Sequence, residues 1–422
     1  MSELSYLEKL LDGVEVEWVP VSELFQIKNG YTPSKSKKEF WENGTIPWFR
    51  LEDVRVNGRE LNDSIQHINP LGVKGCLFPK NSIFMSTTAT IGEYALVRVP
   101  YLTNQQITNF SISEKFSEAV NIKYIFYRFY DFGKWCTENA NKSGGVSIIG
   151  LKKLSQYQFP IPCPDNPEKS LAIQSEIVRI LDKFTALTAE LTAELNMRKK
   201  QYNYYRDQLL SFDEEQEKPI YLEKLLDGVE VEWKLLGDAS FFEIANNGRK
   251  PVKSSLRIAG KTPYYGANNI QDYVDGYTHD GEYVLIAEDG SASLENYSIQ
   301  YATGKFWANN HVHVVRGKTR VNSRFLFHYL HIVNFIPFLT GGVRAKLTKG
   351  QLIEISVPIP CPDNTEKSLA IQAEIVRILD KFDTLTNSIT EGLPREIELR
   401  QKQYEYYRDL LFSFPKPETV SN

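Results

Sequence analysis

The stretch PIPCPDNPEKSLAIQSEIVRILDKF at residues 160–184 decides the organisation of this chain, because it recurs at residues 358–382 with two differences. A second block, YLEKLLDGVEVEW at residues 6–18, recurs unchanged at residues 221–233. A repeat period of about 200 residues is too long for a solenoid. It predicts a duplicated unit in which a domain is followed by a helix.

A third block closes each copy of this unit: QYNYYRDQLLSF at residues 201–212 returns as QYEYYRDLLFSF at residues 403–414. The segments between the first two blocks, residues 19–159 and 234–357, share little sequence. We infer that the constant blocks do one job twice and that the variable segments do two different jobs.

The first long block begins a strong helical pattern. No Gly or Pro interrupts Ala172–Leu210, which predicts one helix of about 39 residues, roughly 58 Å long. Asn166 or Ser170 is expected to cap its start. Apolar side chains fall on one face of this helix: Ile173, Ile177, Ile180, Phe184, Leu187 and Leu191. Such a helix needs a partner helix.

The second copy of the block supplies that partner. It repeats the same apolar spacing in Ile371, Ile375, Ile378, Phe382, Leu385 and Ile389. Gly392 and Pro394 are expected to break the second helix, with Pro394 in the first turn of its continuation. Two copies of one unit that close about a pseudo-twofold axis predict an antiparallel pairing of the two helices.

The variable segments predict strands and short helices. Alternating or apolar runs predict strands at Ser82–Ser86, Tyr94–Val99, Glu282–Ala287 and Val312–Val315, and amphipathic patterns predict helices at Ala119–Tyr130 and Arg324–Leu330. The predicted fold class is α+β, with two mixed α/β domains joined by two long antiparallel coiled-coil helices in an internal pseudo-twofold repeat. The predicted boundaries are 1–160 for the first domain, 161–212 for the first helix, 213–358 for a linker and the second domain, and 359–422 for the second helix.

The net charge of −4 conceals a division between the two kinds of segment. Residues 19–160 carry 17 basic and 12 acidic side chains, residues 234–358 carry 14 and 10, and the rest of the chain carries 18 and 31. Two unlike basic domains on an acidic frame favour a polyanionic partner, although an uneven spread of solvated charge is the simpler alternative.

Neither a membrane span nor a signal peptide is expected. No apolar run is long enough to cross a bilayer, and the N-terminal residues are acidic where a signal peptide is basic and then apolar. Four cysteines in a chain of 422 residues do not make a disulfide framework, so reduced thiols are expected. The predicted location is cytoplasmic.

The constant blocks resemble those of the specificity subunits of type I restriction–modification enzymes, and they look most like the IC subgroup. The resemblance is carried by the two blocks quoted first, by the tandem TAEL at residues 188–195 and by RKKQYNYYRDQLLSF at residues 198–212. In the variable segments, NGYTPSKSKKEFWENGTIPWFR at residues 29–50, YYGANNI at 264–270 and GKFWANNHVHVV at 304–315 are similar in style to that family's target-recognition domains.

This resemblance implies a DNA-specificity subunit that catalyses nothing itself. Each variable segment would be a target-recognition domain that reads one half of a split double-stranded DNA sequence. The helices would hold the two domains at a fixed distance and dock two methyltransferase subunits, to which restriction and translocase subunits attach. The chain would bind no cofactor, and its partners would use S-adenosylmethionine, ATP and Mg²⁺.

Base edges are read by Asn, Gln, Arg, Lys and hydroxyl side chains, and Lys and Arg also hold phosphates. The candidate DNA contacts in the first variable segment are Lys35, Lys37, Lys38, Arg50, Thr87, Thr88, Thr90, Asn104, Gln105 and Gln106. Those in the second are Asn246, Asn247, Arg249, Lys250, Asn268, Asn269, Asn309, Asn310, Arg344 and Lys346. For any single residue, a turn position or a solvated surface charge is the simpler alternative.

The repeated leucines of the first constant block are candidates for the methyltransferase interface, together with the outward faces of both helices. They are Leu7, Leu10 and Leu11 and their equivalents Leu222, Leu225 and Leu226. The alternative is that these leucines only seal each domain onto the helix pair.

No catalytic or metal-binding motif is complete. GKT at residues 260–262 and 317–319 lacks the glycine that a phosphate loop needs five residues earlier. His311 and His313 would share one face of a strand, but further ligands at suitable spacing are missing, so no metal site is expected. Two other classes stay open: an enzyme in its own right, which methyl transfer by the purified chain would revive, and a tandem adaptor that binds only proteins.

Paired helices between two reading domains would act as a ruler, because the spacing of half-sites follows from protein geometry. One TAEL unit adds about 6 Å of helix, against roughly 3.4 Å per base pair of DNA. Deletion of residues 192–195 is therefore predicted to change the unread gap by about one or two base pairs. Methylation mapping measures the gap, and a variant with the parental gap would contradict the prediction.

Overall fold

A computed structural model of the chain describes residues 6–11, 13–142, 145–212, 220–226, 229–341 and 345–415. For residues 6–8 and 222 it describes the backbone alone. The chain divides into two compact units, of which the first comprises Met1–Ala189 with Leu399–Asn422 and the second comprises Glu190–Glu398. Each unit therefore combines one variable segment with parts of the constant helices from both copies of the repeat.

The first variable segment forms a five-stranded sheet of order β2-β9-β6-β7-β4 and a three-stranded sheet of order β5-β3-β8. The strands are β2 Phe25–Asn29, β3 Ile46–Phe49, β4 Glu60–Leu61, β5 His67–Ile68, β6 Ser82–Ser86, β7 Tyr94–Val97, β8 Leu102–Thr103 and β9 Ile107–Ile112. The helical elements are α2 Val21–Leu24, η1 Lys38–Phe40, α3 Leu51–Asn57, η2 Pro70–Gly72, η3 Glu114–Phe116, α4 Ile122–Glu138 and α5 Leu151–Leu154. The flanking constant elements are α1 Tyr6–Leu11 and the antiparallel pair β1 Val16–Pro20 and β10 Gln158–Pro162.

The second variable segment forms two four-stranded sheets, of orders β12-β19-β16-β17 and β14-β13-β18-β15. Its strands are β12 Phe242–Ile244, β13 Ala259–Tyr265, β14 Ile270–Val274, β15 His279–Asp280, β16 Tyr283–Ala287, β17 Ile299–Ala302, β18 Lys305–Ala308 and β19 Val312–Gly317. The helical elements are η4 Asn246–Gly248, η5 Ser254–Leu256, α8 Ser323–Leu330, η6 Ile336–Phe338 and α9 Lys349–Leu352. The flanking constant elements are α7 Ile220–Leu225 and the antiparallel pair β11 Val231–Leu235 and β20 Ser356–Pro360.

The two variable domains share one topology although their sequences differ. The order β2-β9-β6-β7 of the first domain matches β12-β19-β16-β17 of the second. The strand pairs that flank them also match, because Trp18 lies opposite Pro160 and Trp233 lies opposite Pro358. The strands predicted from alternation are confirmed with small differences at their ends, and the internal repeat extends through the variable domains.

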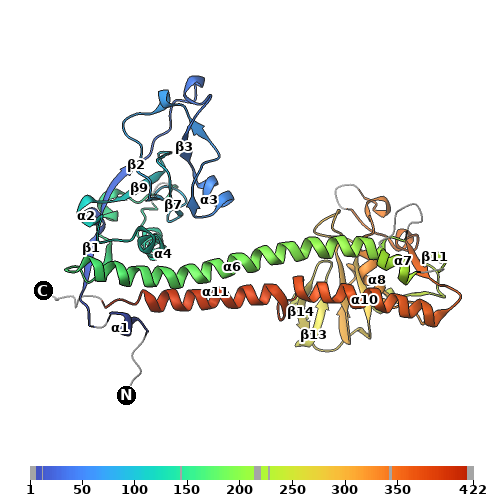
Figure 1. Cartoon of the computed structure of the whole chain (residues 1–422). Helices are drawn as coiled ribbons and strands as arrows, with labels where there is room; N and C mark the ends of the chain where they lie inside the picture. Colours follow the sequence, from blue (N-terminus) through green and yellow to red (C-terminus); the bar gives the residue numbers. More distant parts are fainter. Residues whose placement is uncertain are drawn as a thin grey trace, which may run out of the picture. The chain divides into compact units, whose positions relative to one another are not determined.

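The core of the first domain is aromatic. Phe25, Phe110, Phe129, Phe132 and Phe159 form a cluster of rings with centroid distances between 5.2 and 5.9 Å. Each such pair contributes about 0.5–1.5 kcal/mol beyond the burial of its area. Figure 1 shows α4, which supplies two of these rings, close to α6.

Helix α6 spans Pro167–Leu210, which is 44 residues. It starts five residues earlier than the predicted start at Ala172, because Pro suits the first turn of a helix and the side chain of Asn166 accepts a hydrogen bond from the amide of Lys169 at 3.0 Å. The predicted single helix is thus confirmed and its cap is Asn166. None of the described helices is long and apolar enough to cross a membrane.

The second constant helix is interrupted as predicted, into α10 Thr365–Asn387 and α11 Gly392–Leu411. Gly392 has a φ of +76°, and a Cβ there would lie 2.5 Å from the carbonyl oxygen of Thr384. Only glycine fits this junction without strain.

In each unit, part of α6 packs against part of the C-terminal helices. In the first unit the ring of Phe184 stacks on Tyr407 at 5.3 Å, and in the second the ring of Tyr205 stacks on Phe382 at 5.6 Å. The earlier part of α6 therefore lies with the later part of α11, and the later part of α6 lies with α10. This is the antiparallel order that the repeat predicts.

A buried glutamine on each constant helix fixes the variable domain of the same unit. Gln174 donates a hydrogen bond to the carbonyl oxygen of Ala119 at 2.9 Å and accepts one from the amide of Asn121 at 2.8 Å. Its equivalent Gln372 accepts one from the amide of Asn322 at 2.8 Å. Because these partners are backbone groups at the start of α4 and α8, the contact tolerates a change of domain sequence.

Eight residues further along α6, the carboxylate of Asp182 contacts α4. It lies 2.9 Å from the Lys123 ammonium and accepts a hydrogen bond of 2.5 Å from the Tyr127 hydroxyl. These bonds add a polar contact between α6 and α4 beside the apolar face of α6.

The second unit has the equivalent polar contact with different partners. Asp380 accepts hydrogen bonds from Arg324 and His328, each at 2.7 Å. Burial works to raise the pKa of Asp380, but these two hydrogen bonds outweigh it and hold the pKa below its usual value. One constant carboxylate therefore holds two chemically different variable helices.

Candidate nucleic-acid interface

Three loops of the first domain leave its larger sheet at one edge. Strands β2 and β6 both run antiparallel to β9, and the ladder pairs Asn29 with Thr108 and Ser86 with Ile107. The ends of β2 and β6 and the beginning of β9 therefore meet at what we name the distal edge. The opposite end of β2 continues through α2 into the constant strand β1, and Figure 1 shows β3 on the side of the domain away from α6.

The distal edge brings together candidates from separate parts of the first variable segment. The amide of Thr87 donates to the carbonyl oxygen of Gln106 at 3.0 Å. The hydroxyl of Thr32 donates to the side-chain oxygen of Gln105 at 2.5 Å. The loops that follow β2 and β6 are thus bonded to the loop that precedes β9.

Arg50 lies beside this group. Strands β3 and β8 run parallel and pair Phe49 with Thr103, so Arg50 and Asn104 follow neighbouring ladder positions. The guanidinium of Arg50 is partly exposed and lies 2.9 Å from the carboxylate of Glu52.

The three lysines of the β2–β3 loop, Lys35, Lys37 and Lys38, are exposed. Lys35 and Lys38 line an open hollow of about 420 Å³ together with Trp41 and Gln66. Exposed ammonium groups on a loop can neutralise phosphates without reading the sequence.

The second domain has an equivalent distal edge. Strands β12 and β16 run antiparallel to β19, and the ladder pairs Ile244 with Val315 and Ala287 with Val312. The loops at residues 245–250, 288–292 and 309–311 therefore meet there.

Glu288 organises the charges of this second distal edge. Its carboxylate lies 2.6 Å from Arg249 and 2.9 Å from Lys346. Burial works to raise the pKa of Glu288, but hydrogen bonds from the two cations lower it below the usual value. The hydrogen bond to Glu288 in turn raises the pKa of Lys346. Two of the candidate cations are thus held in place by one acid.

His313 lies beneath this cluster and is fully buried. One ring nitrogen is 2.7 Å from the carbonyl oxygen of Leu347, and the other is 2.9 Å from the side-chain amide of Asn246. Burial lowers the pKa of His313, so the ring is neutral near pH 7.

Several candidates use their polar groups within the domain. The Thr87 hydroxyl lies 2.8 Å from that of Thr108, and the side-chain oxygens of Asn104, Asn246, Asn268 and Asn309 all accept hydrogen bonds from nearby backbone amides. These hydrogen bonds hold the loops of the distal edges in shape.

Other candidates present their side chains to the surface, and Thr88 is half-buried. Those exposed are Lys35, Lys37, Lys38, Thr90, Gln105, Gln106, Asn247, Lys250, Asn269, Asn310 and Lys346. Arg344 lies outside the described residues.

Two acidic residues of the second distal edge, Glu288 and Asp289, were not among the candidates from the sequence. His311 was considered there only as a metal ligand. Asp289 accepts a hydrogen bond of 2.5 Å from the His311 ring, and both side chains are partly exposed. Glu288 and Asp289 directly follow the predicted strand Glu282–Ala287, just as Thr87 and Thr88 follow β6. Their place after a strand was the available signal.

The repeated leucines lie against the cores of their units. Leu11 and Leu226 are buried, and Leu10 and Leu225 are partly buried against the same cores. The side chains of Leu7 and Leu222 lie outside the described residues. The packing favours the sealing role for the described leucines.

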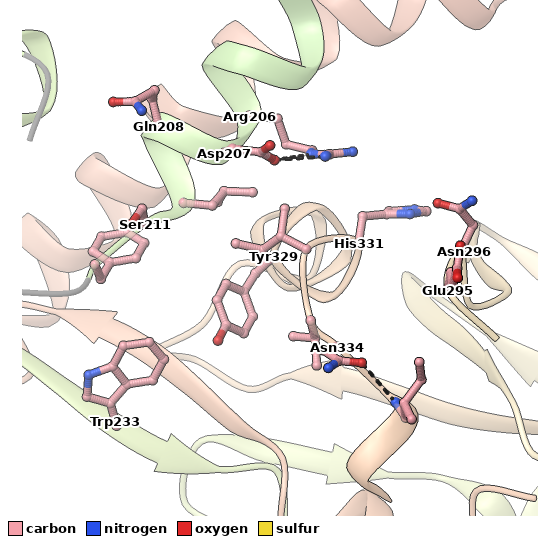
Figure 2. A pocket seen from close by; sticks show the side chains of 15 residues that line it. Arg206, Asp207, Gln208, Ser211, Trp233, Glu295, Asn296, Tyr329, His331 and Asn334 are labelled. Atoms are coloured by element: carbon pink, nitrogen blue, oxygen red, sulfur yellow. Dashed lines mark hydrogen bonds and ion pairs between the residues drawn. The ribbon is translucent and has the colours of Figure 1, made fainter. Parts of the chain in front are cut away.

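A hollow of about 660 Å³ in the second unit lies between the end of α6 and the end of α8. In Figure 2 the side chains of Trp233, Tyr329 and His331 lie around it, and a dashed line joins Arg206 to Asp207. Burial lowers the pKa of His331 to about 4, so its ring is neutral near pH 7. Helix α8, which ends beside this hollow, has eight residues where its counterpart α4 has 17.

A metal site would need several ligating side chains close together. Among the described residues no three His, Cys, Asp or Glu side chains gather closely enough to hold a metal ion. His311 and His313, the pair noted in the sequence, contact Asp289 and the backbone of Leu347 instead.

The chain matches the family model described as type I restriction modification DNA specificity domain, over residues 13–198 and again over residues 230–399. It is 47% identical over 403 residues to the type I restriction enzyme EcoprrI specificity subunit of Escherichia coli, which covers 93% of each chain. A further type I restriction enzyme specificity subunit of Escherichia coli is 38% identical over the full length of both chains.

Among solved structures, the S subunit of a type I restriction-modification system from M. genitalium is similar in fold. The match has a TM-score of 0.58 at 17% sequence identity and covers 96% of this chain and 98% of that one. The shared fold therefore persists at low sequence identity.

Replacement of Glu288 by Gln tests the charge cluster of the second distal edge. Glu288→Gln is predicted to lower the free energy of unfolding by about 1–3 kcal/mol at pH 7, because two cations lose a charged acceptor. Since the folded state lowers the pKa of Glu288, this stabilisation exists above the usual value of 4.5 and is lost as the pH falls below it. Urea unfolding of both proteins between pH 4 and pH 8 measures the difference.

Asp280→Asn is the matched control, because Asp280 is an exposed acid of the same domain in β15. It is expected to leave stability unchanged within about 0.5 kcal/mol. A difference between wild type and Glu288→Gln that grows as the pH falls would contradict the assignment.

Proposed function

Because this chain belongs to the family of type I restriction–modification DNA specificity proteins, we propose that it selects the DNA sequence on which a type I complex acts. Each variable domain reads one half of a bipartite double-stranded target through its distal edge. The two half-sites are different because the side chains of the two edges differ.

One observation carries this proposal: two domains of one topology, joined to repeated constant elements, present different side chains at equivalent edges. The first edge presents hydroxyl, amide and ammonium groups, whereas the second presents an acid–base cluster around Glu288. Hydroxyl and amide groups are suited to base edges, and exposed lysines are suited to phosphates. Both variable segments also carry a net positive charge.

The constant parts dock two methyltransferase subunits in this proposal, and restriction and translocase subunits join through them. Two equal copies of a docking surface suit two copies of one partner. The chain itself catalyses nothing and binds no cofactor, and its partners supply the chemistry with S-adenosylmethionine, ATP and Mg²⁺.

Methylation mapping of DNA from cells that carry this chain with its methyltransferase partner tests the proposal. The expected result is a single modified motif made of two different specific halves with an unspecific gap between them. Binding of the purified complex to that motif should weaken steeply as salt rises, because phosphate contacts release counterions.

A different outcome would favour one of the alternatives. Methyl transfer by the purified chain alone would assign it a catalytic role. A complex that shifts no DNA at any salt concentration would favour a protein-binding adaptor. A modified motif without an unread gap would contradict bipartite reading.

A further inference from the structure

The two distal edges can be compared position by position, because their backbone hydrogen bonds match. The amide of Thr87 donates to Gln106, and the amide of Glu288 donates to the carbonyl oxygen of His311 at 2.8 Å. The next residue in each domain also has a matching backbone partner. Thr88 forms an isolated β-bridge with Ile148, and Asp289 forms one with Lys346. Thr88 and Gln106 of the first domain therefore correspond to Asp289 and His311 of the second.

The Asp289–His311 pair is both exposed and held in place. The ring nitrogen Nδ1 of His311 lies 2.5 Å from the Asp289 carboxylate, and the two side chains are 49% and 41% exposed. The backbone amide of His311 donates to the side-chain oxygen of Asn309 at 2.8 Å, and Asn309 is buried. The Asp289 carboxylate accepts a hydrogen bond from Nδ1–H and so fixes the orientation of the His311 ring.

DNA phosphates repel an exposed carboxylate at the interface. Such a carboxylate is therefore unfavourable unless it accepts a hydrogen bond from a donor on a base. In the major groove only cytosine and adenine offer an amino group, through N4 and N6, while guanine O6 and thymine O4 are acceptors. The second oxygen of the Asp289 carboxylate is free to accept such a hydrogen bond, and His311 holds that carboxylate in place. The Asp289 carboxylate therefore matches the exocyclic amino group of a cytosine or adenine and is unfavourable against a carbonyl oxygen of guanine or thymine.

The neighbouring acid does not share this role. Glu288 is 16% exposed and is held by Arg249 and Lys346, whereas Asp289 faces His311. Lys250 is exposed at the same edge and can neutralise a phosphate.

We propose that Asp289 and His311 together read one cytosine or adenine in the half-site of the second domain. The inference rests on the proposed function and adds the residue pair and the class of base. At the matched positions of the first domain, Thr88 and Gln106 offer uncharged groups and read the other half-site.

The test compares methylation motifs and DNA binding for the wild-type complex and for complexes with substituted chains. Asp289→Ala is expected to relax one base pair in the half-site of the second domain and to reduce discrimination there about tenfold. His311→Ala should relax the same position. The other half-site should be unchanged in both variants.

Two matched controls separate base reading from general effects. Thr88→Ala should alter only the opposite half-site, and Asp280→Asn should alter neither. Asp289→Asn removes a negative charge, so it should strengthen binding to DNA without the motif while it weakens the preference for the motif. If Asp289 had only a packing role, the preference for the motif would stay unchanged.

Thermal unfolding confirms that each variant folds, since substitution of an exposed residue is expected to cost little stability. Wild-type discrimination at every position in Asp289→Ala and His311→Ala would overturn the inference and leave the proposed function standing. Loss of any bipartite motif for the wild-type complex would instead overturn the proposed function and this inference together.

Discussion

The buried glutamine on each constant helix is the contact on which the rest of the structure depends. Gln174 and Gln372 bond to backbone groups at the start of the variable helices, and a buried amide left without partners would cost about 1–3 kcal/mol. The nearby Asp182 and Asp380 accept hydrogen bonds from unlike side chains. A constant helix can therefore hold any domain that presents the right backbone geometry and one donor. The helices can keep one sequence while the variable domains diverge, because the contacts between them depend mainly on backbone groups of the domains.

The same constraint explains where the two domains differ. One end of each sheet continues into the constant strands, so its shape must be preserved. The distal edge does not continue into the constant strands, so its loops can vary. They carry hydroxyl and amide groups in the first domain and the Glu288 cluster in the second. Loops on a rigid scaffold are where proteins of one fold usually vary their binding. The topology therefore separates the part that must stay constant from the part that can choose a sequence.

The long helices, the break before Pro394 and the strands β6, β7, β16 and β19 could be predicted from the sequence, because each depends on local periodicity or on backbone-restricting residues. The fold class and the repeat followed from the quoted blocks. The composition of the distal edge could not be predicted, since it depends on the register of β9 between β2 and β6. The Asp289–His311 contact joins residues 22 positions apart and was missed because acids were not expected to face a polyanion. Helix α4 also runs on to Glu138, beyond the predicted end at Tyr130, because the aromatic core covers its later turns.

Exchange of the domains tests the central claim most directly. In a chain with residues 234–357 in place of residues 19–159, the repeated flanking blocks keep Gln174 and Asp182. The transplanted domain brings the backbone amide of Asn322 and the side chains of Arg324 and His328, which Gln372 and Asp380 hold in the second unit. The account predicts that this chain folds and directs methylation to a target whose two halves are both the half-site of the second domain. A chain that folds and still marks the original first half-site would contradict it, and so would a first unit that fails to fold around the transplanted domain.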